Sequence, residues 1–134
     1  MTSHFYQSIV IATDGSDNTQ RAISYGIEIA KLSRATVYAL HVVDTSSFSQ
    51  SWTAGREAMY EILRKDGQKA TSKIKEYGEA SGVEVIEVLL EGHPSNEIID
   101  FAENNNIDLI VMGTLGKTGL DRFLMGSVAE KVVR

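Results

Sequence analysis

The feature that most constrains this chain is a regular alternation of short apolar runs with segments of helical period along its 134 residues. Four runs rich in β-branched residues predict strands, at Ser8–Thr13, Thr36–Val43, Val83–Leu90 and Asp108–Met112. The first run lacks the polar–apolar alternation of a half-exposed strand, which predicts burial on both faces. Glutamates interrupt the third run, which favours an edge position.

Amphipathic patterns between these runs predict helices from about Asn18 to Ser33, Gly55 to Ala80 and Pro94 to Asn104, and a last helix over Arg122 to Arg134. On the second helix the expected apolar side comprises Met59, Ile62, Leu63, Ala70, Ile74 and Tyr77. Strands that alternate with helices predict an α/β fold, an open parallel sheet with helices on both faces. Ligands bind such sheets beyond the carboxyl ends of the strands. The loops after the first and fourth strands are therefore the candidate sites.

Composition excludes several kinds of chemistry. The chain has no cysteine, so disulfides, cysteine-based zinc sites and thiol nucleophiles are absent. Its three histidines lack metal-ligand spacing, and the net charge of −5 argues against a nucleic-acid partner. No apolar run approaches the length of about 18 residues that a membrane span needs, and no secretory signal is visible. We expect a cytoplasmic protein with no membrane partner.

A glycine-rich segment follows the fourth strand. It contains Gly113, Gly116, Gly119 and Gly126, and glycines allow backbone amides to approach a phosphate closely. A Walker A motif would need a further glycine where Val111 stands, and the dinucleotide fingerprint G-x-G-x-x-G is also absent. The segment is therefore a phosphate-loop candidate of another type.

The spacing G-x2-G-x9-G-S, formed by Gly113, Gly116, Gly126 and Ser127, resembles the nucleotide-binding signature of the universal stress protein family. The segments Ile9–Ser16, Leu40–Asp44, Asp108–Thr114 and Gly126–Glu130 are similar to the family's first, second and fourth strands and to the opening of its last helix. The resemblance implies an adenine nucleotide alpha hydrolase-like sheet of strand order 3-2-1-4-5. It also implies a single domain over residues 1–134, whose fifth strand we expect to be missing from this chain and present in a longer natural protein.

The resemblance further implies a site for ATP or another adenine nucleotide, with Mg²⁺ able to accompany the phosphates. The positions that match the family's nucleotide contacts are Ala12, Thr13, Asp14, Val42, Met112, Gly113, Gly116, Gly126, Ser127 and Val128. The chain departs from the family at two places, with Ala12 where proline is common and Leu115 where histidine is frequent. No catalytic residue and no protein metal ligand is assigned.

From the residues alone, Asp14 is equally well explained as a helix N-cap, and His41 is better explained as a satisfied core histidine than as a base. The main hypothesis is an ATP-binding stress-response regulatory module that forms a homodimer. Two alternatives stay open, a slow ATP hydrolase and a dimeric interaction scaffold that binds no nucleotide.

Overall fold

The fold is described from a computed structural model, which describes residues 6–13, 20–45, 54–115 and 121–123. For 54, 56, 113–115 and 121–123 the backbone alone is described. The elements are β1 (Ser8–Ala12), α1 (Gln20–Ser33), β2 (Thr36–Asp44), α2 (Ala54–Ala80), β3 (Val85–Gly92), α3 (Pro94–Asn104), β4 (Leu109–Leu115) and β5 (Asp121–Phe123).

The strands form one sheet of order β3-β2-β1-β4-β5, in which the first four are parallel. The predicted order 3-2-1-4 is therefore confirmed, with β3 at an edge. The central position of β1 explains its composition, because Ile9, Val10 and Ile11 have no exposed surface at all. Strands buried on both faces carry continuous apolar runs rather than alternating ones.

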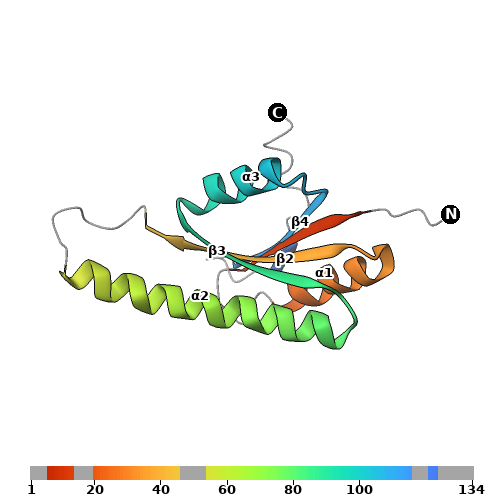
Figure 1. The fold of residues 1–134 in the computed structure, drawn as a ribbon, viewed down its shortest axis with the longest axis horizontal. Helices are drawn as coiled ribbons and strands as arrows, with labels where there is room; N and C mark the ends of the chain where they lie inside the picture. The colour runs from red at the N-terminus through yellow and green to blue at the C-terminus, as the bar shows by residue number, and fades with distance from the viewer. Residues whose placement is uncertain (1–5, 14–19, 46–53, 116–120, 124–134) are drawn as a thin grey trace.

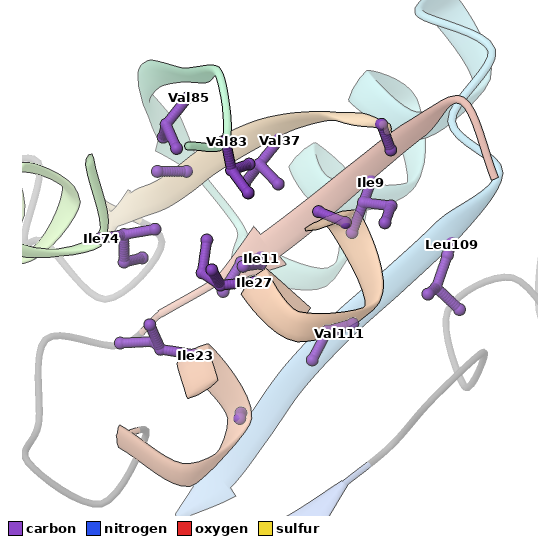
Figure 2. Close-up of a cluster of buried hydrophobic side chains, with 14 residues drawn as sticks. Ile9, Ile11, Ile23, Ile27, Val37, Ile74, Val83, Val85, Leu109 and Val111 are labelled. Atoms are coloured by element: carbon purple, nitrogen blue, oxygen red, sulfur yellow. The ribbon is translucent and has the colours of Figure 1, made fainter. Parts of the chain in front are cut away.

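Helices cover both faces of the sheet, as expected (Figure 1). In that view α3 lies above the sheet, and α1 and α2 lie below it. The larger core cluster fills the space between the sheet and the lower helices, where Ile11, Ile27 and Val111 meet from β1, α1 and β4 (Figure 2). A second cluster joins the other face to α3, through Leu40, Val42 and Ile98 among others. None of the helices in the described ranges combines the length and apolarity of a bilayer span.

All three described helices end in the same turn. At each end an N–H donates to the carbonyl five residues earlier, in the pairs Ala35 to Ala30 (3.0 Å), Val83 to Gly78 (2.8 Å) and Ile107 to Ala102 (3.0 Å). The residue before each donor has a positive φ, namely Arg34 (59°), Gly82 (83°) and Asn106 (52°). Because Val83 is still bonded to α2, β3 begins two residues later than the predicted Val83.

The predicted last helix is wrong where it can be compared. Arg122 and Phe123 lie in β5, which pairs antiparallel with Thr114 and Gly113 of β4. The physical reason is that β4 has an open edge on the side away from β1, and the chain that follows pairs with this edge. The fifth strand implied by the resemblance would follow the last helix, so β5 is a separate element. Residues 124–134 lie outside the described ranges.

The apolar side expected for α2 is only partly buried. Ala70 and Ile74 are in the core, whereas Met59, Ile62 and Tyr77 are 47%, 56% and 40% exposed. The helix has 27 residues, about 40 Å at 1.5 Å per residue, and the nine residues of β2 span only about 30 Å. The helix is therefore longer than the strands it covers, and its amino-terminal part extends past the sheet (Figure 1).

Candidate functional site

A cavity of about 360 Å³ opens at the carboxyl ends of β1, β2 and β4, where an open parallel sheet binds its ligands. Small-molecule sites range from about 300 to 1,000 Å³, so the volume suits a small organic ligand. The cavity is lined by Ala12, Thr13, Leu40, His41, Val42, Val43, Asp44, Leu63, Pro94, Ile98 and Met112.

Four of the predicted site residues meet in this cavity. Ala12 is the last residue of β1 and lies between its register partners, Leu40 of β2 and Met112 of β4. Thr13 follows Ala12, and Val42 lies two residues beyond Leu40 on the same face of β2. The sheet therefore brings Ala12, Thr13, Val42 and Met112 together although they come from segments up to 100 residues apart.

The backbone of Val42 is directed toward the space that β1 leaves when it ends. Successive residues of β2 bond alternately to its two neighbours, since the Thr36 amide donates to Gln7 before β1 and the Val37 amide donates to Glu84 before β3. The backbone N–H and C=O groups of the even-numbered residues of β2 thus point toward β1. Among the described residues, the Leu40 carbonyl is the last such group to be bonded, by the Thr13 amide at 2.9 Å. Val42 comes next in this series, so its N–H and C=O point to the cavity side.

Thr13, the residue that follows β1, is hydrogen-bonded to a histidine side chain. Nδ1 of His41 lies 2.9 Å from the carbonyl oxygen of Thr13, and because a carbonyl only accepts, Nδ1 must carry the proton. The expectation that His41 is hydrogen-bonded is confirmed, but its side chain is half-buried and lines the cavity. It is therefore part of the site rather than of the closed core.

Three lining residues, Leu63, Pro94 and Ile98, come from helices on opposite faces of the sheet. Sequence reasoning did not select them. The first turn of α3 follows β3 after one residue, so its position at this edge could have been found from topology. The position of Leu63 depends on where α2 rests on the sheet, for which no local signal exists.

The other predicted positions are not tested. Gly113 follows Met112 on β4 and pairs with Phe123. Asp14, Gly116, Gly126, Ser127 and Val128 lie outside the described residues. Within the described ranges, no group of three or more histidine, aspartate or glutamate side chains is placed to hold a metal ion.

A second polar contact lies at the carboxyl end of β3. The Tyr60 hydroxyl donates to the Glu91 carboxylate. This hydrogen bond raises the pKa of Tyr60 above its ordinary value of 10.0, because the phenolate could not donate and would also face the Glu91 charge.

The open parallel sheet, with helices on both faces and a cavity beyond the ends of its central strands, places the chain in the class of open-sheet α/β domains. Comparison with known proteins narrows this class. The model of the universal stress protein family matches residues 5–134, and the chain belongs to that family.

Individual relatives agree with this assignment. Universal stress protein MJ0531 of Methanocaldococcus jannaschii is 48% identical, over 98% of this chain and 78% of its own length. The structure of universal stress protein UspA from Lactobacillus plantarum superimposes with a TM-score of 0.79 at 27% identity, covering 96% of this chain and 90% of that chain. A universal stress protein from Archaeoglobus fulgidus, solved in complex with dAMP, gives a TM-score of 0.64 at 26% identity, covering 96% and 90%.

Proposed function

We propose that this chain binds ATP or another adenine nucleotide in the cavity at the carboxyl ends of β1, β2 and β4. The observation that carries the proposal is the meeting of Ala12, Thr13, Val42 and Met112 around one cavity of nucleotide-compatible size. The relative from Archaeoglobus fulgidus that was solved with dAMP supports an adenine ligand. The base would lie against the apolar walls, where the Val42 backbone can exchange hydrogen bonds with its edge.

The phosphates would extend toward the glycine-rich segment after β4, where backbone amides can bind anions. The full proposed set is Ala12, Thr13, Asp14, Val42, Met112, Gly113, Gly116, Gly126, Ser127 and Val128. When bound, Mg²⁺ would neutralise phosphate charge. The output we propose is regulatory, a nucleotide-dependent change in shape or in partner binding of a homodimer in the stress response.

Calorimetric titration with ATP, ADP and AMP tests the binding, and GTP serves as the control for the base. We expect adenine nucleotides to bind below millimolar concentration and GTP to bind at least about tenfold more weakly, a difference of about 1.4 kcal/mol. Absence of ATP binding near millimolar concentration, with the protein folded, would refute the proposal.

Two tryptophan substitutions on α2 locate the site. Leu63 lines the cavity, and Met59, one helical turn earlier, is exposed and does not line it. Leu63→Trp should fill the space of the ligand and weaken adenine nucleotide binding about tenfold or more, while Met59→Trp should change it by less than about twofold. Equal effects of the two would place the ligand elsewhere.

Two measurements test the proposed regulatory role: the rate of ATP hydrolysis and the oligomeric state of the protein. ADP formation that follows protein concentration and disappears in Gly113→Val would make the protein a hydrolase instead. Sedimentation with and without ATP measures the homodimer, and a dimer indifferent to ATP, with no binding in the titration, would favour the scaffold alternative.

A further inference from the structure

We propose that His41 is a positioning residue of the nucleotide site, because its Nδ1–H binds the Thr13 carbonyl in place of the Val42 amide. This inference rests on the proposed nucleotide binding. It adds that the His41–Thr13 hydrogen bond keeps the backbone edge of β2 at Val42 from pairing with β1.

In a regular parallel pair, one residue donates its N–H to one residue of its neighbour and accepts at its C=O from the residue two positions further along. The Thr13 amide follows this rule, since it donates to the Leu40 carbonyl at 2.9 Å. The next ladder bond would join the Thr13 carbonyl to the Val42 amide. Among the described residues no backbone hydrogen bond joins these two groups. The Thr13 carbonyl is bound instead by the His41 side chain, at 2.9 Å.

This exchange of hydrogen-bond donors matters because Val42 is the residue whose backbone points to the cavity. If Thr13 took the Val42 amide, β1 would continue along β2 and cover that part of the edge. With His41 as the donor, the buried Thr13 carbonyl is satisfied and the Val42 N–H remains for the adenine edge. One side chain thus ends the strand pairing and leaves a polar group at the base of the cavity.

Packing fixes the ring in this orientation. Gly67 of α2 lies directly over it, so close that a Cβ on Gly67 would come within 2.4 Å of His41 Cδ2. The same Cβ would come within 2.8 Å of Leu89 Cδ1 on β3. The carbon edge of the imidazole therefore faces the helix, and Nδ1 faces Thr13. The ring sits where it is because α2 can approach the sheet closely at Gly67.

The test compares His41→Asn with His41→Leu. Asparagine places an N–H donor at the position of Nδ1, and leucine has nearly the same shape without a donor. Both variants lose the same ring packing, and His41→Leu loses the hydrogen bond as well, so its melting temperature should fall further than that of His41→Asn. Adenine nucleotide affinity should fall about fivefold to tenfold in His41→Leu, the effect of one ordinary hydrogen bond, and His41→Asn should recover most of it.

The outcomes are separable. If the wild-type protein binds no nucleotide, the proposed function fails and this inference fails with it. If the wild-type protein binds but the two variants bind equally, the positioning role alone is refuted. As an independent measurement, ¹⁵N NMR of the ligand-free protein should show the Nδ1–H form of His41, and a neutral ring protonated at Nε2 alone would overturn the hydrogen bond on which the inference rests.

Discussion

Replacing Gly67 with alanine probes the contact that confines His41. The new Cβ would lie 2.4 Å from His41 Cδ2 and 2.8 Å from Leu89 Cδ1, well inside an ordinary contact. The Leu89 methyl is the flexible end of a side chain and can move aside. The imidazole cannot retreat by the required distance of about 1 Å without stretching its 2.9 Å hydrogen bond to Thr13 beyond the limit of about 3.2 Å.

The size of the effect follows from three terms. Alanine favours the helix over glycine by about 1 kcal/mol. Loss of the Thr13–His41 hydrogen bond costs about the same amount, so these two terms nearly cancel. Overpacking of a filled contact costs a further 1–3 kcal/mol, roughly. We therefore expect Gly67→Ala to lower the free energy of unfolding by about 1–3 kcal/mol, although alanine is the better helix former.

Urea denaturation followed by circular dichroism measures this change. Asp66→Ala is the matched control, because Asp66 is the exposed neighbour on the same helix and its replacement raises helix propensity without a steric conflict. It should leave stability unchanged or slightly raised. A Gly67→Ala protein as stable as the control, with undiminished nucleotide affinity, would show that α2 is free to move away and would refute the reasoning.

Three further outcomes are expected. Ile74→Ala, at a fully buried position, should lower the free energy of unfolding by about 2–5 kcal/mol in urea denaturation, and Ile62→Ala, 56% exposed on the same helix, should lower it by less than about 1 kcal/mol. Arg34→Gly should raise the melting temperature, because Arg34 has a φ of 59° that glycine adopts without strain; no rise would mean that the turn is unstrained. The stabilisation from the Tyr60–Glu91 hydrogen bond should be complete at neutral pH and disappear as the pH rises above 10.0 through the raised pKa of Tyr60, so the melting-temperature gap to Tyr60→Phe should close there.

The element order could be predicted because each signal is local. A β-branched apolar run such as Ile9–Ile11 by itself favours a buried strand, and Pro94 suits the first turn of a helix. The expected start of the last helix at Arg122 was wrong because a non-local strand pairing decides the structure there, and residues 124–134 of that helix lie outside the described ranges. The edge of β4 that faces away from β1 is open, and Gly113–Leu115 pair there with residues 121–123.

The candidate site also contains some residues that local patterns predict and others that depend on how the helices pack. Ala12, Thr13, Val42 and Met112 could be predicted because each stands at the end of a strand with a recognisable pattern. His41 was predicted to be hydrogen-bonded, but its place in the cavity depends on the close contact of α2 at Gly67. Leu63 lines the cavity for the same reason, as a residue one turn before that contact. Neither position could be derived without knowing where a helix rests on the sheet.

The central position of β1 has a consequence for how the sheet forms while the chain is being synthesised. β1 pairs with β2, which is synthesised about 28 residues later, but the other edge of β1 pairs with Leu109–Met112, which are synthesised some 100 residues later. Until then Ile9 and Ile11 lack the cover that Leu109 and Val111 provide on one side. We expect the nascent chain to expose this edge until β4 has been synthesised and to complete the β1–β4 pairing only then.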